Sequence, residues 1–182
     1  MGSHLFENRV ISRVREIFKI GYEVLESFKY LGLGLNQTDD KIVLSQKDYV
    51  NVLKTVSVDS KRIKDSKLTS AEQTILRSKV GQLLWLAKQT RPDIAFDIAM
   101  IASKLKTGTV ADLKGANKLL RKVKNDPVSL QVEDLGENVE LMLYSDTSFG
   151  NLPDGGSQGG FVMLLQGENG NVNAVTWQSK KI

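Results

Sequence analysis

The chain has 182 residues and contains no cysteine. It therefore uses neither disulfides nor thiolate metal sites, which fits a reducing, intracellular compartment. It also lacks an apolar run long enough to cross a bilayer and a pattern typical of a signal peptide, so we expect no membrane partner. Residues 1–4 (Met-Gly-Ser-His) resemble an expression scar, and we expect no structural role for them.

The charge is distributed unevenly along the chain. The hydrophobic fraction of 41% and the charged fraction of 25% are typical of a globular protein, with a net charge of +4. Residues 127–182 hold two basic and seven acidic side chains, a net charge of −5, which leaves +9 for residues 1–126. The basic part is a candidate for contact with a polyanion. The simpler interpretation is a solvated surface, and charge alone favours it.

The N-terminal pattern predicts a helix followed by a β-hairpin. Apolar residues recur at helical spacing over residues 5–19. Apolar residues alternate with polar residues or glycine over 28–35, which predicts one strand, and 42–44 is the return strand of the hairpin. Asp39 and Asp40 fall in the intervening turn, where turn chemistry is a far commoner role for an aspartate pair than a metal site.

Three capping patterns predict the helices in the middle of the chain. Ser45 can cap one helix, Thr69 with Glu72 three positions later has the form of a capping box, and Thr109 opens a third helix. These positions predict a helical unit in the middle of the chain. Its first two helices are joined by a polar, basic linker over residues 57–68.

The helix that begins near Thr69 has a broad apolar face, and Trp85 projects from its other side, one turn after Gly81. We therefore expect this helix to be buried on two sides, with Trp85 packed in the core rather than stacked on a base. Residues 90–93 end this helix and start the next one. Residues 94–105 are apolar almost all round, which predicts an internal helix.

Basic side chains line one face of the helix that follows Thr109. Four cations along a helix could follow a phosphate backbone, although a solvated helix face is the commoner case. Arg91 is ambiguous: we favour a structural salt bridge or helix-end hydrogen bond over a phosphate contact. The candidate nucleic-acid contacts are therefore Lys114, Lys118, Arg121, Lys122 and Arg91.

From residue 127 onward the pattern is β. Antiparallel strands with no helix after them leave one sheet face uncovered, so this part resembles a domain cut short. The predicted strands cover residues 129–132, 139–146, 159–165 and 172–177, with a hairpin turn at 167–171.

Six short segments carry a family resemblance: 28–33 (FKYLGL), 44–50 (LSQKDYV), 77–95 (RSKVGQLLWLAKQTRPDIA), 144–150 (YSDTSFG), 157–161 (SQGGF) and 176–181 (TWQSKK). Each segment alone is a weak to moderate signal. Together, and in this order, they resemble copia-type (Pseudoviridae) retrotransposon Pol polyproteins over nearly the whole chain. The resemblance implies the C-terminal part of a reverse transcriptase that runs into the start of ribonuclease H.

The fold implied by this resemblance is α+β. Residues 5–44 resemble the helix and hairpin at the end of the polymerase palm, and residues 45–126 a helical thumb- or connection-like unit. Residues 127–182 resemble a partial RNase H-like domain, which begins with an antiparallel three-stranded sheet.

The resemblance makes Asp146 the first carboxylate of the hydrolase site, where it would bind Mg²⁺ or Mn²⁺ in the full-length parent. Two-metal hydrolysis needs several carboxylates, and the family's other carboxylates would lie beyond this chain. We therefore expect an incomplete catalytic and metal site, with no metal bound and no activity by this chain alone. Ser148 also departs from the aspartate that the family usually has there.

The expected partners are an RNA–DNA hybrid or template–primer duplex and the rest of the Pol polyprotein. An alternative is a domesticated or truncated, non-catalytic binding or assembly module. Such a module would form a homo-oligomer through its exposed sheet, because a free edge and face invite pairing with another copy.

Overall fold

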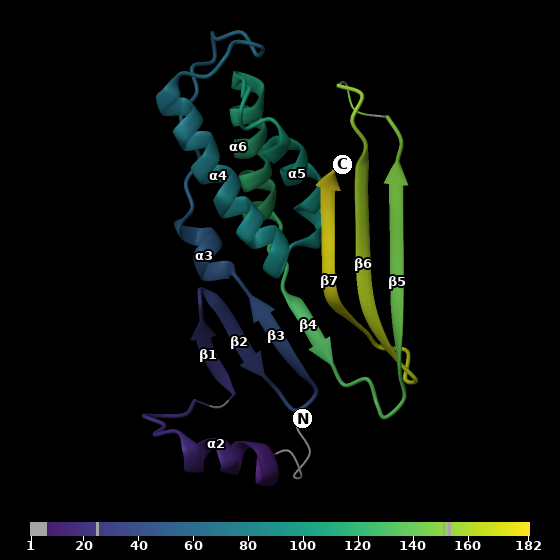
Figure 1. The fold of residues 1–182 in the computed structure, drawn as a ribbon. Coiled ribbons are helices and arrows are strands. Elements are labelled where there is room, and N and C mark those ends of the chain that lie inside the picture. The colour runs from purple at the N-terminus through teal and green to yellow at the C-terminus, as the bar shows by residue number, and fades with distance from the viewer. Residues whose placement is uncertain (1–6, 25, 151, 153) are drawn as a thin grey trace.

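The computed structural model describes residues 7–24, 26–150, 152 and 154–182 (Figure 1). The expected scar at residues 1–4 and the start of the predicted N-terminal helix lie outside the described residues. The described part is α+β, as predicted, with two antiparallel sheets. None of its helices is both long and apolar enough to cross a membrane.

A four-stranded sheet lies below a helical unit, and a three-stranded sheet stands beside that unit (Figure 1). In chain order the elements are η1 (Glu7–Ile11), α2 (Ser12–Ile17), β1 (Ser27–Tyr30), β2 (Leu33–Gln37), β3 (Lys41–Ser45), α3 (Lys47–Val52), α4 (Ser70–Gln89), η2 (Pro92–Ile94), α5 (Ala95–Ser103), α6 (Val110–Asn125), β4 (Leu130–Glu133), β5 (Val139–Ser148), β6 (Gln158–Gly167) and β7 (Val172–Lys181).

The prediction of one strand over 28–35 is wrong, because the chain reverses in the middle of that segment. β1 and β2 are separate strands that pair antiparallel, with Tyr30 opposite Leu33. Leu31 and Gly32 between them have φ values of 50° and 80°. Two successive residues with positive φ are typical of the tightest hairpin turns. The predicted hairpin between 35 and 42 is present as the β2–β3 pair.

β4 joins the N-terminal sheet rather than the strands that follow it. It pairs antiparallel with β3, with Leu130 opposite Leu44 and Val132 opposite Ile42, which gives the order β1-β2-β3-β4. The sheet therefore crosses the domain boundary that we placed at residue 127. That boundary itself remains a prediction.

The hydrophobic core lies in the helical unit and draws its buried side chains from residues between Leu53 and Val123. The predicted capping box at Thr69 and the predicted cap at Thr109 are both present, and both are capping boxes. Glu72 Oε2 accepts a hydrogen bond from the Thr69 N–H at 2.9 Å, and Asp112 Oδ2 accepts one from the Thr109 N–H at 2.8 Å. The predicted apolar stripe of α6 is buried: Leu113, Ala116, Leu120 and Val123.

Ser45 is the last residue of β3 and Gln46 is the N-cap residue of α3, but the Ser45 hydroxyl accepts a hydrogen bond from the Lys47 N–H at 3.3 Å. The predictions about the burial of α4 and α5 are wrong. The α5 helix is not internal, since Phe96 is 52% exposed and only Ile98 is fully buried. Gly81 is exposed and a Cβ there would meet open space, so α4 is not buried on two sides. Trp85 is half-buried and lies outside the core cluster.

The three-stranded sheet, in the order β5-β6-β7, reaches the helical unit through its β7 edge (Figure 1). The Trp177 indole N–H donates to the Ala87 carbonyl at 2.6 Å. The Asn173 side chain accepts from the Glu133 N–H at 2.9 Å and donates to the Glu133 carbonyl at 2.8 Å. These contacts attach β7 to α4 and β4 and leave the predicted uncovered face, which includes Leu141 at 62% exposure.

Candidate nucleic-acid interface and carboxylate site

The predicted cationic face of α6 is present on the side opposite the core. At about 100° per residue, the four cations fall within one third of the helix circumference. Lys118, Arg121 and Lys122 are exposed, and Lys114 is half-buried. Lys122 Nζ lies 3.6 Å from Asp93 Oδ2, which is the one ion pair of this face in the described part of the chain. The other three cations are available to an anionic partner.

Arg91, in contrast, is buried with 2% exposure of its side chain. Its Nε and one terminal nitrogen donate to the two carboxylate oxygens of Asp93, at 2.8 and 2.9 Å. The other terminal nitrogen donates to the Asp126 carbonyl at 2.7 Å and is 3.4 Å from the Val123 carbonyl. Arg91 therefore ties the end of α4 to η2 and to the end of α6, and these four hydrogen bonds leave at most one of its five N–H donors for a phosphate.

The Arg91–Asp93 pair also has an electrostatic signature. Its hydrogen bonds raise the pKa of Arg91 and lower the pKa of Asp93, because both charged forms are stabilised. Our preferred interpretation of Arg91, a structural ion pair, agrees with this geometry. The structure does not support its alternative assignment as a nucleic-acid contact.

Asp146 lies near the end of β5, opposite Gly160 of β6, and its side chain is exposed. One of its carboxylate oxygens accepts a hydrogen bond from the Thr147 N–H at 2.8 Å. The residue lines a cavity of about 550 Å³ between the sheet and the start of α5, together with Phe96 and Trp177. The incomplete packing of α5 thus leaves open space in front of the predicted carboxylate.

Three polar side chains that were not among the predicted site residues line the cavity with Asp146. Ser148, Gln158 and Ser179 line the same cavity. Gln158 is buried; its side-chain nitrogen donates to Ser179 Oγ at 2.7 Å, and Ser148 Oγ donates to the Gln158 carbonyl at 3.2 Å. All three lie just outside the predicted strands, which ended at 146, began at 159 and ended at 177, whereas the observed strands β5, β6 and β7 include them. A period-two continuation of the strands was the signal that could have found them.

The described residues alone do not fit a centre for Mg²⁺ or Mn²⁺. No group of three or more histidine, cysteine, aspartate or glutamate residues gathers in the described part of the chain. Asp146 has serine and glutamine neighbours, and two-metal hydrolysis needs several carboxylates around the ions. We therefore derive no catalytic step from this arrangement.

The cationic face and Asp146 lie on different elements, α6 and β5. Lys122 of the cationic face contacts Asp93 of η2. The neighbouring Pro92 lines the same cavity as Asp146.

Comparison with known proteins gives one informative similarity. The chain is 29% identical over 169 residues to a Saccharomyces cerevisiae protein whose name assigns it to the transposon Ty5-1. This similarity supports a retrotransposon-related protein. The match covers 85% of this chain and 53% of the relative, so the chain spans about half the length of the protein it matches. No protein-family model matches the chain.

Proposed function

We propose that this chain is part of a copia-type retrotransposon reverse transcriptase and ribonuclease H, and that it helps to grip an RNA–DNA hybrid or template–primer duplex. The similarity to the Ty5-1 protein supports the retrotransposon origin. The exposed cationic face of α6 is the observation that carries the gripping role. Phosphate contacts supply most of the sequence-independent affinity for nucleic acid, and this face offers Lys114, Lys118 and Arg121 without ion pairs among the described residues.

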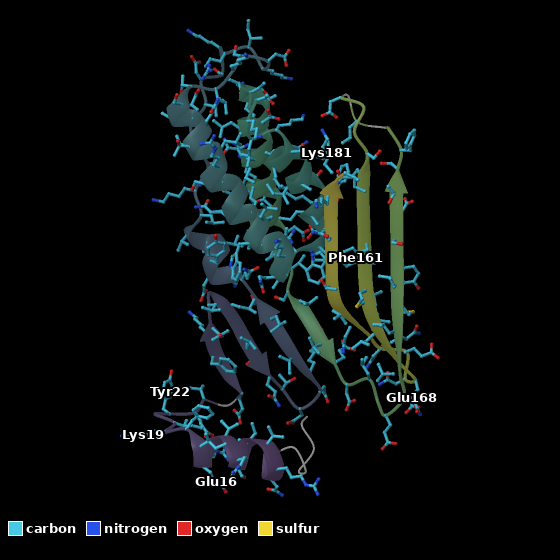
Figure 2. All side chains as sticks on the ribbon, viewed as in Figure 1. Glu16, Lys19, Tyr22, Phe161, Glu168 and Lys181 are labelled. Atoms are coloured by element: carbon cyan, nitrogen blue, oxygen red, sulfur yellow. The ribbon has the colours of Figure 1, made fainter. Side chains whose placement is uncertain are left out.

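The test is hybrid binding measured by fluorescence anisotropy over a series of salt concentrations. We expect Lys118→Ala/Arg121→Ala to weaken binding about tenfold at 0.1 M salt and to reduce the slope of log K against log [salt] by roughly 2, since each lost phosphate contact removes about 1. The matched control is Arg9→Ala/Lys19→Ala, which removes the same charge from η1 and from the segment after α2. Lys19 lies away from the helical unit (Figure 2). Equal loss in both variants would contradict the proposal.

The same proposal includes Asp146 as one carboxylate of a site that other parts of the polyprotein complete. The chain by itself is expected to leave the RNA strand of a hybrid intact in the presence of Mg²⁺ or Mn²⁺. Cleavage by the purified chain that Asp146→Asn abolishes would show instead that the chain holds a complete site.

A second candidate function is self-association through the β5–β7 sheet. It is favoured by the uncovered sheet face, on which Leu141 and Leu143 are 62% and 59% exposed, and by the free edge of β5. Light scattering separates the candidates. A monomer whose hybrid binding depends on salt favours the gripping role, and a dimer that is insensitive to salt favours self-association.

A further inference from the structure

A cavity of about 150 Å³ lies where α3, α4 and α6 meet the strand segment that leads into β4. It is separate from the cavity in front of Asp146 and from the outer face of α6. The residues that matter here are Gln46, Lys47, Thr90, Arg91 and Lys124, all of which line it.

Gln46 brings an unpaired donor to this cavity. The residue is 2% exposed, and its Oε1 accepts a hydrogen bond from Thr90 Oγ1 at 2.8 Å. Its Nε2 is buried and has no hydrogen-bond partner among the described residues. A buried unpaired donor costs about 1–3 kcal/mol, and native proteins rarely leave one. A hydrogen-bond acceptor inside the cavity is the partner that this amide lacks.

The charges around the cavity favour an acceptor that is negatively charged. Lys47 and Lys124 form no ion pair in the described part of the chain. Arg91 is the third cation that lines the cavity, but its guanidinium is paired with Asp93.

Nearby carboxylates cancel only part of this positive charge. Asp48, which follows Lys47, pairs with Lys29 at 2.5 Å. Asp126 lies 3.8 Å from the Arg91 guanidinium, which Asp93 already pairs, so Asp126 offsets one of the two lysine charges. The cavity therefore combines a buried amide donor with two free ammonium groups, which is a donor set suited to a phosphate oxygen.

We propose that this cavity binds a terminal phosphate group, either inorganic phosphate or the phosphate monoester at the end of a nucleic-acid strand. Gln46 Nε2 donates to one oxygen, and Lys47 and Lys124 balance the charge. The cavity volume of about 150 Å³ is sufficient for one phosphate group. This inference does not depend on the role proposed for the outer face of α6.

The experiment uses the full chain and three probes: inorganic phosphate, a short 5′-phosphorylated oligonucleotide and the same oligonucleotide with a 5′-hydroxyl. We expect phosphate to raise the melting temperature at constant ionic strength, and the 5′-phosphorylated strand to bind at least tenfold more tightly than the 5′-hydroxyl strand. Gln46→Met keeps a side chain of similar length without the donor, and Lys124→Ala removes one charge. In both variants the preference for the 5′-phosphorylated strand should fall at least tenfold, and phosphate should no longer raise the melting temperature.

Lys106→Ala is the matched control, because it removes the same charge at an exposed lysine that lines neither the cavity nor the cationic face of α6. It should keep the preference for the 5′-phosphate. Equal loss in Lys106→Ala and Lys124→Ala, or no effect of phosphate on the wild type, would overturn the proposal. A preference for inorganic phosphate without one for the 5′-phosphate would restrict the ligand to the free ion. A melting temperature of Gln46→Met without phosphate that matches the wild type shows that the variant folds.

Discussion

Residues 53–123 enclose a continuous apolar core, whereas the three ten-residue strands β5, β6 and β7 have no buried apolar side chain in their described residues. The helical unit is stabilised mainly by removal of apolar surface from water. The three-stranded sheet is held by its own backbone hydrogen bonds and by a few contacts along β7 (Figure 1). Three-stranded sheets need a packed face for independent stability, so we expect this sheet to open more readily than the helices.

The largest expected effect is the difference between two leucine-to-alanine changes. Leu83 in α4 is 1% exposed and Leu143 in β5 is 59% exposed. Leu83→Ala should lower the free energy of unfolding by about 3–4 kcal/mol, because it leaves a cavity in the core. Leu143→Ala should lower it by no more than about 1 kcal/mol. Urea unfolding at equilibrium measures both.

A large cost for Leu143→Ala would mean that another surface covers this sheet face in solution. The same measurement at several protein concentrations would then identify a second copy as that surface, because the stability of an oligomer depends on concentration. If the loss of stability in Leu143→Ala does not depend on protein concentration, the covering surface lies within the same chain.

The next effect compares two asparagines that make the same contact in the two regions. Asn117 in α6 accepts from the Val56 N–H at 2.9 Å and donates to the Val56 carbonyl at 2.8 Å, as Asn173 does with Glu133. Asn117→Ala should destabilise the whole helical unit by about 2 kcal/mol, because it leaves backbone groups unpaired near the core. Asn173→Ala should cost about 1 kcal/mol and mainly release the β4–β7 contact.

Hydrogen exchange distinguishes these outcomes. Asn173→Ala should speed the exchange of the Glu133 amide and of β7 while the amides of α4 and α6 keep their protection. The control is Asn125→Ala at the exposed end of α6, which should change neither stability nor exchange. Faster exchange in α4 after Asn173→Ala would show that the sheet and the helices unfold as one unit.

Local chemistry made part of this structure predictable from the sequence. The capping boxes at Thr69 and Thr109 form within three residues of chain, and the period of α6 fixes which of its side chains face the core. The turn at Leu31 was missed, because alternating strand residues continue on both sides of it and leucine seldom adopts positive φ. The pairing of β4 with β3 was also missed, because their residues lie far apart in the sequence and the apolar pattern of a strand does not specify its partner.

The candidate site was likewise predictable from the sequence only where local patterns determine it. The exposure of the α6 cations follows from helical periodicity, which the sequence contains. The role of Arg91 depends on carbonyl groups of Val123 and Asp126, more than 30 residues away, so the sequence could only leave two interpretations open. The cavity in front of Asp146 was not predictable, because it exists only where α5 and β7 meet at an edge and leave Phe96 uncovered.

The smallest expected effect concerns pH and the Arg91–Asp93 pair, which belongs to the helical unit. The hydrogen bond from Arg91 lowers the pKa of Asp93 in the folded protein below the value of about 3.9 expected when unfolded. The stabilisation from this carboxylate is therefore fully present above about pH 4–5 and is lost as pH falls through the folded pKa. Asp93→Asn should reduce stability at pH 7 by about 1 kcal/mol and abolish this part of the acid dependence.

The measurement is the free energy of unfolding in urea between pH 2 and pH 7, taken as the difference between wild type and variant. That difference should shrink as pH falls, because protonation removes in the wild type the charge that the substitution removes in the variant. Asp65→Asn, an exposed residue with no ion pair in the described part of the chain, is the matched control and should give a small difference at every pH. The difference for Asp93→Asn could instead stay constant down to pH 2. Arg91 would then hold α4 and α6 together mainly through its hydrogen bonds to the carbonyls at the end of α6, and the carboxylate charge of Asp93 would contribute little.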